Sequence, residues 1–287
     1  MQPTGVFVGA ATLDLHYLLP TAPPPNTKGP AQRFGLYAGG PATNAAVAFA
    51  HLGGRARLYT EVGSHPLGAV IADDVGRLGV EMINMIGGTD AVPMVSAIIT
   101  TGDTGDRTVV ASHYPNEGMS TGFDGEIPAG AGILLVDGFL MAAAVEAARL
   151  ASDSGIPVVL DAGSWKPGMD DLLAHIDIAI CAADFQPPGT TGCEEAIDHL
   201  FGRGITRVAV TGGGQPIRYR DGESTGEVPI EAVPVVDTLG AGDILHGAFC
   251  YYLAAGSSFA DALGAAAEVA TASTRSFGTR AWMHPTG

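Results

Sequence analysis

The chain has 287 residues, of which 46% are hydrophobic and 15% are charged, and its formal net charge is −16. A chain of this length and composition can bury its own core, so an intrinsically disordered chain is excluded. The excess of acidic residues argues against a nucleic-acid partner, because binding to phosphates depends on Lys and Arg.

The cysteines and the apolar runs give expectations about the compartment. Cys181, Cys193 and Cys250 lie far apart without C-x-x-C spacing, which is typical of a reducing environment and not of a zinc site or a disulfide framework. The N-terminal stretch lacks the basic region and apolar core of a signal peptide, and no run of about 18 apolar residues is present to span a membrane. We therefore expect a cytoplasmic protein with no membrane partner.

Short apolar runs alternate with helical patterns along most of the chain. Residues 5–10, "GVFVGA", predict a buried strand, and residues 41–54 predict a helix, because a proline opens them and two glycines close them. The other expected strands are 56–63, 80–86, 132–138, 156–162, 177–182 and 206–212. The other expected helices are 66–79, 141–155, 191–204, 241–255 and 258–275. This alternation predicts an α/β fold in three layers, with a mostly parallel central sheet and helices on both faces.

Two segments break the alternation, because neither is followed by a helix. They are residues 15–38 and residues 92–114, the second of which contains two strand-like runs around a Gly/Asp turn. We expect a small antiparallel sheet, a β lid, that stands apart from a main body within one domain. The main body would comprise residues 1–14, 39–91 and 115–287. The alternative is a pair of long loops, although structureless loops of about 20 residues are uncommon in compact domains.

The stretch "DTLGAGD", residues 237–243, combines small residues with an acid at the start of an expected helix. Gly240, Ala241 and Gly242 leave the backbone N–H groups at the helix N-terminus accessible, which favours an anion site. Asp243 follows in the first turn, where it has two interpretations. It is either an acid that stabilises the helix end, or a base that removes a proton while a hydroxyl attacks a phosphoryl group.

The stretch "GGPATN", residues 39–44, has a similar ambiguity. Gly39 and Gly40 allow the backbone to pass close to a ligand. The amide of Asn44 offers both a donor and an acceptor to sugar hydroxyls, or else it satisfies backbone groups in the first turn of its helix.

Together the two stretches resemble the two signatures of the ribokinase-like (PfkB) family of carbohydrate kinases. The first signature is Gly39 and Gly40, then Asn44, Gly53 and Gly63, and the second is "DTLGAGD" followed by "HGAF". Their order and separation also match, and the resemblance covers essentially the whole chain. It implies a ribokinase-like fold and an ATP-dependent kinase that phosphorylates a hydroxyl of a small sugar of the ribose, fructose or ketose class.

The resemblance also implies residue roles around the transferred group. Asp243 would be the general base, and the backbone N–H groups of Gly240, Ala241 and Gly242 would form the anion hole. His246, three residues after the base, is expected to pack behind it and not to take part in the chemistry.

Substrate contacts would come from both signatures and from the lid. The residues implied are Asp14, Gly39, Gly40, Asn44 and Arg107. Asp14 is expected at the end of the first strand motif, "GAATLD", and Arg107 would reach the sugar or a phosphate from the lid. The plainer alternatives are a turn acid for Asp14 and a solvated hairpin arginine for Arg107.

The nucleotide site implied by the resemblance lies near the C-terminus of the chain. Its candidate residues are Thr211, Gly213, Ala267, Ala270 and Gly278. ATP would bind there with Mg²⁺, and Asp237 would hold a K⁺ ion; without the cation, Asp237 would brace the anion hole.

One region departs from the family pattern. Many members carry an N-x-x-E motif that orders Mg²⁺, but the corresponding region, "CAADFQPPG" (181–189), has Asp184 as its only acid. This departure points towards the ketohexokinase-like branch and motivates one alternative, a non-catalytic sugar-binding protein on a kinase scaffold. A second alternative, on the same fold, is a nucleoside kinase of the adenosine type. Apolar runs in the lid also lead us to expect a homodimer formed through the lid sheet.

Overall fold

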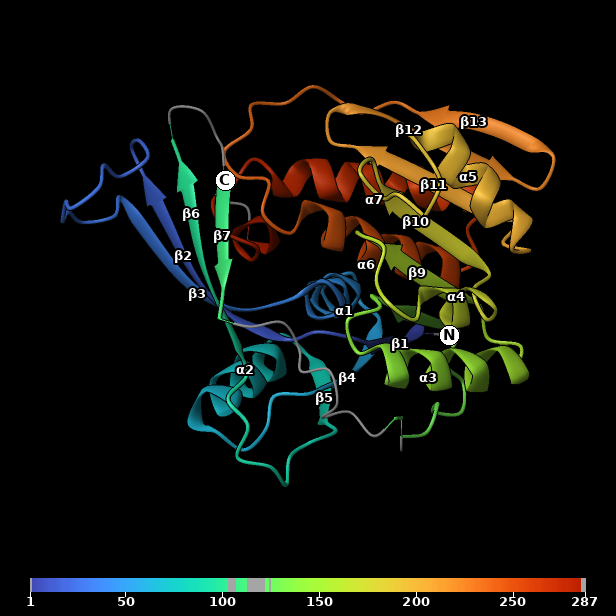
Figure 1. The fold of residues 1–287 in the computed structure, drawn as a ribbon, viewed down its shortest axis with the longest axis horizontal. Helices are drawn as coiled ribbons and strands as arrows, with labels where there is room; N and C mark the ends of the chain where they lie inside the picture. Colours follow the sequence, from blue (N-terminus) through green and yellow to red (C-terminus); the bar gives the residue numbers. More distant parts are fainter. Residues whose placement is uncertain (1, 103–106, 113–121, 124, 285–287) are drawn as a thin grey trace.

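A computed structural model describes residues 2–102, 107–112, 122–123 and 125–284 of the chain. The main sheet of the described residues runs across the whole molecule (Figure 1). Its nine strands are, in spatial order, β13 (Ser224–Val228), β12 (Gln215–Asp221), β11 (Arg207–Gly212), β10 (Ile178–Ala182), β9 (Val158–Ala162), β8 (Ile133–Val136), β1 (Thr4–Val8), β4 (Arg55–Thr60) and β5 (Val80–Asn84). All pairs from β11 to β5 are parallel, whereas β12 and β13 pair antiparallel at one edge.

Helices cover both faces of this sheet. Alternate strand residues divide the core in two, so that Phe7 and Leu135 pack on one side while Val8 and Leu134 pack on the other. The first side is covered by α1 (Pro41–His51), α2 (Pro66–Arg77), α6 (Ala241–Ala254) and α7 (Phe259–Ser273). The second side is covered by α3 (Met141–Asp153), α4 (Met169–Leu173) and α5 (Cys193–Gly202). The predicted three-layer α/β fold is therefore confirmed.

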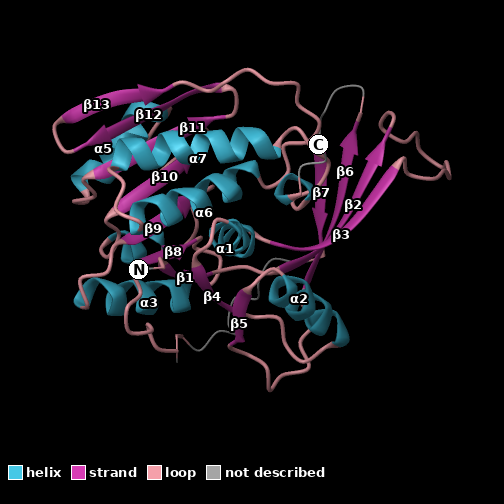
Figure 2. Cartoon of the chain, turned by 180° about the vertical axis from the view of Figure 1, so that it is seen from behind, coloured by secondary structure: helices cyan, strands magenta, loops and turns pink. Residues whose placement is uncertain are grey.

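Four strands form a second sheet that projects from one end of the main layers in both ribbon views (Figures 1 and 2). In spatial order they are β3 (Arg33–Gly39), β2 (Thr12–Leu19), β6 (Met94–Thr101) and β7 (Arg107–Ala111). The prediction of a small second sheet is confirmed, but the sheet is mixed and not purely antiparallel. The pairs β2–β3 and β6–β7 are antiparallel as expected, whereas β2 pairs parallel with β6. In the chain, β2 follows β1 and β6 follows β5, two strands of the parallel part of the main sheet.

The boundaries of the second sheet also differ from the expected segments. Residues 12–14 and Gly39, expected in the main body, are the first part of β2 and the end of β3. The expected Gly/Asp turn at 103–106 and the end of the second lid segment lie outside the described residues, as do residues 115–121 and 285–287 of the expected main body.

Local sequence explains how α1 and α6 come close together. Gly40 precedes α1 with φ 98° and lies so close to the end of β1 that a Cβ atom there would be 2.3 Å from the Ala10 carbonyl oxygen. Gly247 of α6 packs on α1, where a Cβ atom would be 2.1 Å from the carbonyl oxygen of Ala45. Glycine at these two positions lets both helix starts meet at the carboxyl ends of the central strands.

Candidate active site

Open α/β sheets bind ligands at the carboxyl ends of their parallel strands, and the candidate residues gather there. Asp137, at the end of β8, is buried and holds this region together. Its carboxylate accepts hydrogen bonds from the backbone N–H groups of Ala10 (2.9 Å), Ala42 (3.2 Å) and Phe139 (2.9 Å). Burial raises the pKa of Asp137, and these N–H groups oppose the rise by stabilising the carboxylate. Asp137 therefore holds the residues after β1 and the start of α1 in place next to each other.

Asp243 lies in the first turn of α6 and contacts the other signature directly. The side-chain N–H of Asn44 donates to Oδ2 of Asp243 at 2.7 Å, joining residues that are 199 positions apart. Burial raises the pKa of Asp243 to about 6, helped by the charge of Asp161 and opposed by the Asn44 hydrogen bond. A carboxylate with this pKa is ionised at neutral pH and is a stronger base than an exposed aspartate.

The three small residues before Asp243 form the start of α6. Gly240 adopts φ 72°, Ala241 is the first helical residue, and Gly242 is exposed. A side chain at Gly240 would also come within 2.9 Å of the Thr279 methyl carbon. The backbone N–H groups of a first helical turn have no partner within the helix, so this end of α6 can accept an anion, although the N–H of Ala241 already donates to the carbonyl oxygen of Thr238 at 3.2 Å.

Asp14 lies in β2 of the small sheet, and not at the end of the first main-sheet strand as expected. It is only 6% exposed and accepts a hydrogen bond of 2.6 Å from the Thr12 hydroxyl. Burial raises its pKa to about 6, with the Asp243 charge adding to the rise and the Arg280 charge opposing it. The carboxylate covers Gly39, where a Cβ atom would be 1.9 Å from Oδ2 of Asp14. Asp14, Gly39 and Asp243 thus belong to one site between the small sheet and α6.

Arg107, the first residue of β7, contacts the loop before α6. Its Nη1 atom donates to the carbonyl oxygen of Thr238 at 2.9 Å and lies 3.3 Å from the Thr238 hydroxyl. The Arg107 guanidinium is therefore not purely solvated, as the hairpin alternative expected. It is not reserved for a ligand either, because it donates to Thr238. It links the small sheet to the stretch that holds Gly240.

Asp237, expected as a K⁺ ligand, is almost fully buried and braces the same stretch. It accepts hydrogen bonds from the backbone N–H groups of Leu239 (3.0 Å) and Gly278 (2.8 Å), and His16 lies 3.7 Å away. Both carboxylate oxygens thus have backbone donors, which corresponds to the bracing role. The Asp237–Gly278 bond also brings one expected nucleotide-site residue close to the stretch that leads into α6.

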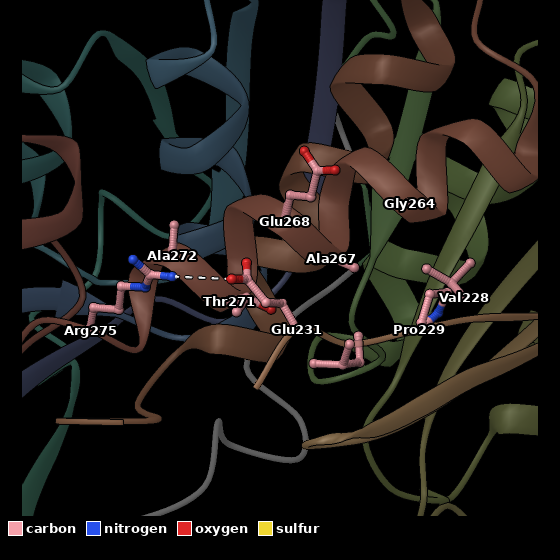
Figure 3. Close-up of a pocket in the computed structure, with 10 residues that line it drawn as sticks. Val228, Pro229, Glu231, Gly264, Ala267, Glu268, Thr271, Ala272 and Arg275 are labelled. Carbon is pink, nitrogen blue, oxygen red and sulfur yellow. Dashed lines mark ion pairs between the residues drawn. The ribbon is translucent and has the colours of Figure 1, made fainter. Parts of the chain in front are cut away.

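A pocket of about 640 Å³ lies between the end of β13 and α7 (Figure 3). Ala267 lines this pocket, and Glu231 and Arg275 form an ion pair of 3.9 Å at it. Ala270 is buried in α7 one turn further along the helix. The pocket lining is Val228, Pro229, Ile230, Glu231, Gly264, Ala267, Glu268, Thr271, Ala272 and Arg275.

The other two expected nucleotide residues lie at the end of β11. The Thr211 hydroxyl donates to the carbonyl oxygen of Cys181 at 3.2 Å, and Gly213 follows in a turn with φ 61°. Asp184, the one acid of the altered "CAADFQPPG" region, is exposed just after β10. Within the described ranges there is no group of three or more His, Cys, Asp or Glu residues placed to hold a metal ion. Nor is any helix in this part of the chain long and apolar enough to cross a membrane.

Two groups of residues that sequence reasoning did not assign also belong to the site. Asp161, at the end of β9, lies 3.5 Å from Nδ1 of His246, and that nitrogen is 2.7 Å from the carbonyl oxygen of Gly242. His246 is buried behind Gly242, at the start of α6. Arg280, from the segment after α7, donates to Oδ1 of Asn44 at 2.9 Å. No motif or spacing in the sequence singles out Arg280, because its partners come from distant segments.

Comparisons with known proteins agree with this geometry. Residues 4–286 match the pfkB family carbohydrate kinase description. A ribokinase of Lactococcus lactis is 26% identical over 261 residues, which cover 87% of this chain and 83% of that protein. A ribokinase of Arabidopsis thaliana, solved in complex with ribose and ATP, superposes with a TM-score of 0.75 at 22% identity and full coverage of both chains. A ribokinase of Thermotoga maritima superposes with a TM-score of 0.76 at 19% identity, over 98% of this chain and 96% of that one. Since the family match spans nearly the whole sequence, the chain belongs to the pfkB family of carbohydrate kinases.

Proposed function

We propose that this carbohydrate kinase transfers the γ-phosphoryl group of ATP to a hydroxyl of a small neutral sugar, with Asp243 as general base. The observation that carries the proposal is the hydrogen bond of 2.7 Å between Asn44 and Asp243. This hydrogen bond joins Asn44, an amide of the kind that recognises a polyol, to Asp243, the proposed base at the anion-binding end of α6.

The proposed reaction uses the groups of this chain as follows. Asp14, Asn44 and the Gly39–Gly40 backbone orient the sugar hydroxyl towards Asp243. The hydroxyl oxygen attacks the γ-phosphorus as the bond to the β-phosphate oxygen breaks, and the hydroxyl proton passes to Asp243. The N–H groups of Gly240, Ala241 and Gly242 stabilise the charge on the transferring phosphoryl oxygens.

ATP would place its base in the pocket lined by Ala267 and Arg275. Mg²⁺ neutralises phosphate charge when it is bound with ATP. Because the described residues contain no dedicated cage for a metal ion, we expect ATP phosphates and water to provide most of its ligands, which is usual for Mg²⁺. We also propose K⁺ binding at Asp237, and a comparison of rates in KCl and in tetramethylammonium chloride tests it.

The charges around the sugar site favour a neutral substrate. The charge of Asp243 raises the pKa of Asp14, and Arg280 is already paired with Asp74 at 3.9 Å. An anionic sugar would add repulsion to two carboxylates without gaining a free cation from Arg280. The relatives named above are ribokinases, so ribose is the first substrate to test, ahead of fructose, other ketoses and adenosine as the nucleoside alternative.

The test is ADP release by the purified chain with ATP and Mg²⁺ against each of these acceptors. Asp243→Asn should keep the fold and the binding of ATP while kcat falls by about 10²–10⁴-fold, the usual contribution of a general base. Wild-type turnover in Asp243→Asn would refute the role of the base. Sugar binding by calorimetry without ADP release from any acceptor would favour the non-catalytic alternative.

We also propose that two copies associate through the outer face of the small sheet. On that face the cross-strand register places Leu36 beside Leu15 and Ala97 beside Val110. Leu36 is 45% exposed, Val110 is 62% exposed, and Phe34, two residues before Leu36, is 56% exposed. An apolar face of this kind at the end of a projecting sheet is typical of an association surface.

A further inference from the structure

Arg280 occupies a position that its sequence context does not explain. It follows α7, and its side chain is only 11% exposed although it carries a charge. A buried guanidinium is costly unless it is paired, so its partners show what it does. Those partners lie on three elements, β3, α1 and α2, that all border the sugar site.

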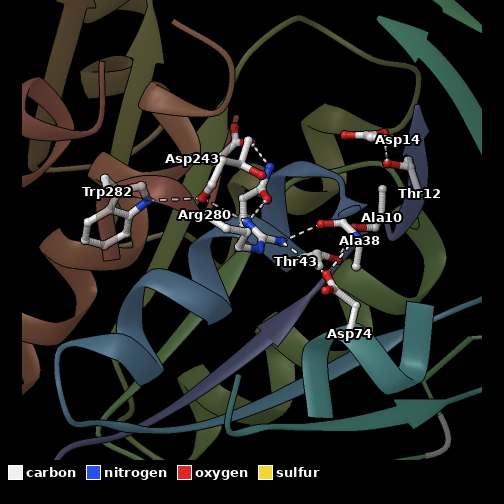
Figure 4. A network of polar contacts seen from close by, with 11 residues as sticks. Ala10, Thr12, Asp14, Ala38, Thr43, Asp74, Asp243, Arg280 and Trp282 are labelled. Atoms are coloured by element: carbon white, nitrogen blue, oxygen red, sulfur yellow. Dashed lines mark hydrogen bonds and ion pairs between the residues drawn. The ribbon is translucent and has the colours of Figure 1, made fainter. Parts of the chain in front are cut away.

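The contacts of Arg280 converge on the first signature stretch (Figure 4). Nη1 donates to Oδ1 of Asn44 at 2.9 Å, and Nη2 donates to the carbonyl oxygen of Ala38. Asp74 of α2 lies 3.9 Å from the guanidinium and accepts a hydrogen bond of 2.8 Å from the backbone N–H of Ala38. Both backbone polar groups of Ala38 are therefore held, directly before Gly39 and Gly40.

The Asn44 contact has a further consequence for the base. An arginine side chain can only donate hydrogen bonds, and an ionised aspartate can only accept them. The Asn44 amide lies between these two side chains. Arg280 must face the amide oxygen of Asn44, and the amide N–H group of Asn44 therefore points towards Asp243. If the amide were reversed, its oxygen would face the Asp243 carboxylate and its N–H group would face the guanidinium, and both contacts would be repulsive.

We infer that Arg280 is a positioning residue for the phosphoryl-transfer site, which fixes the Asn44 amide against Asp243 and holds the Gly39–Gly40 turn through Ala38. The role of Arg280 in catalysis rests on the proposed function. The hydrogen bonds that link Arg280 to Asp243 through Asn44 can be tested without turnover. Arg280 contacts neither the sugar nor the phosphoryl group in this role; it acts through Asn44 and Ala38.

Several groups influence the ionisation of Asp243 and must be considered in the test. The charges of His246 and Arg107 lower its pKa, whereas the charge of Asp161 raises it. Arg280 interacts with both Asp14 and Asp243 through its charge. A variant that keeps the charge therefore separates the positioning role from a purely electrostatic one.

The experiment compares Arg280→Lys with wild type by ¹³C NMR titration of aspartate carboxyl groups without substrate. The Asp243 signal is assigned by its loss in Asp243→Asn. A lysine keeps the charge, but its donors all lie on one nitrogen, so it cannot reproduce the two separate guanidinium nitrogens that hold Asn44 and Ala38. We expect the Asp243 midpoint to rise by about one pH unit, the worth of one hydrogen bond to a charged group. Arg149→Lys, on the exposed face of α3, is the matched control and should leave the midpoint unchanged.

The same substitution in an Asn44→Leu background completes the test. If Arg280 acts through Asn44, Arg280→Lys has no further effect on the Asp243 midpoint once Asn44 is gone. An unchanged midpoint in the single variant, or an equal shift in both backgrounds, would overturn the inference. Thermal unfolding of each variant verifies that the comparison is between folded proteins, and Arg280→Gln provides a second variant with a planar side chain.

Turnover adds a second, separate readout. In a wild-type protein that releases ADP, Arg280→Lys should lower kcat by up to about 100-fold, as expected for a displaced reacting group, and move the acid limb of kcat/KM to higher pH. If wild type phosphorylates no acceptor, the proposed function fails, whereas the NMR titration still decides the role of Arg280.

Discussion

The crossing of α1 and α6 allows a sharp test of how packing controls the base. Gly247 of α6 lies against Ala45 of α1, where the Cβ of an alanine would be 2.1 Å from the Ala45 carbonyl oxygen. Ordinary contact begins at 3.4 Å, so in Gly247→Ala the two helices must separate by about 1.3 Å. The Asn44–Asp243 hydrogen bond spans the same pair of helices at 2.7 Å, and a lengthening of that size takes it beyond hydrogen-bonding distance.

We expect Gly247→Ala to lose about 1–3 kcal/mol in the free energy of unfolding and up to about 100-fold in kcat. The measurements are urea unfolding followed by circular dichroism and ADP release with the best acceptor. Gly76→Ala is the matched control, because Gly76 is an exposed residue of α2 where a Cβ atom would meet nothing beyond its own helix within 4 Å. That variant should gain about 0.5–1 kcal/mol and keep wild-type kcat. A Gly247→Ala protein that gains stability as Gly76→Ala does, with unchanged kcat, would refute the reasoning.

Three further predictions concern ionisation and assembly. The acid limb of kcat/KM should have a midpoint near pH 6, because only the ionised form of Asp243 accepts a proton. Arg107→Gln should move that limb to higher pH, because the substitution removes a charge that lowers the Asp243 pKa. Asp14→Asn should be more stable than wild type at pH 8 and lose this gain near pH 4, as paired thermal unfolding curves would reveal. Burial raises the pKa of Asp14 from 3.8 to about 6 in the folded protein, so the cost of its ionisation builds up between these two pH values and is complete above pH 6. Leu36→Asp should convert a dimer to a monomer in light scattering, and a wild-type monomer at the same concentration would contradict association through the small sheet.

Much of the main sheet could be predicted from the sequence, because buried parallel strands appear as short apolar runs between helices with clear end signals. The expected strand at 156–162 and helix at 241–255 correspond to β9 and α6 within a few residues. The hairpin of β12 and β13 is absent from the prediction. It lies at the sheet edge, where residues such as Arg218 and Glu227 are exposed and disrupt the apolar pattern.

Part of the site could be predicted for a different reason. Asn44 and Asp243 stand in stretches whose small residues already indicate a close approach of the backbone to a ligand. The predicted strand for Asp14 is wrong, because "GAATLD" reads as one run although the chain leaves the main sheet after β1 and enters β2 at Thr12. Arg280 could not be predicted at all. Its four partner groups come from β3, α1, α2 and its own segment, and only the folded chain brings them together.

The position of Arg280 also accounts for how this site tolerates its carboxylates. The Asp243 charge opposes the ionisation of Asp14, and both are needed in the ionised form if one binds the sugar and the other accepts a proton. A cation placed between them would relieve the repulsion, but it would also occupy the space of the sugar. Arg280 instead lies behind Asn44, where its charge lowers the pKa of Asp14 while its hydrogen bond reaches Asp243 through the amide. Asp74 and Ala38 hold the guanidinium in that place, so the space between the two carboxylates stays free for a polyol.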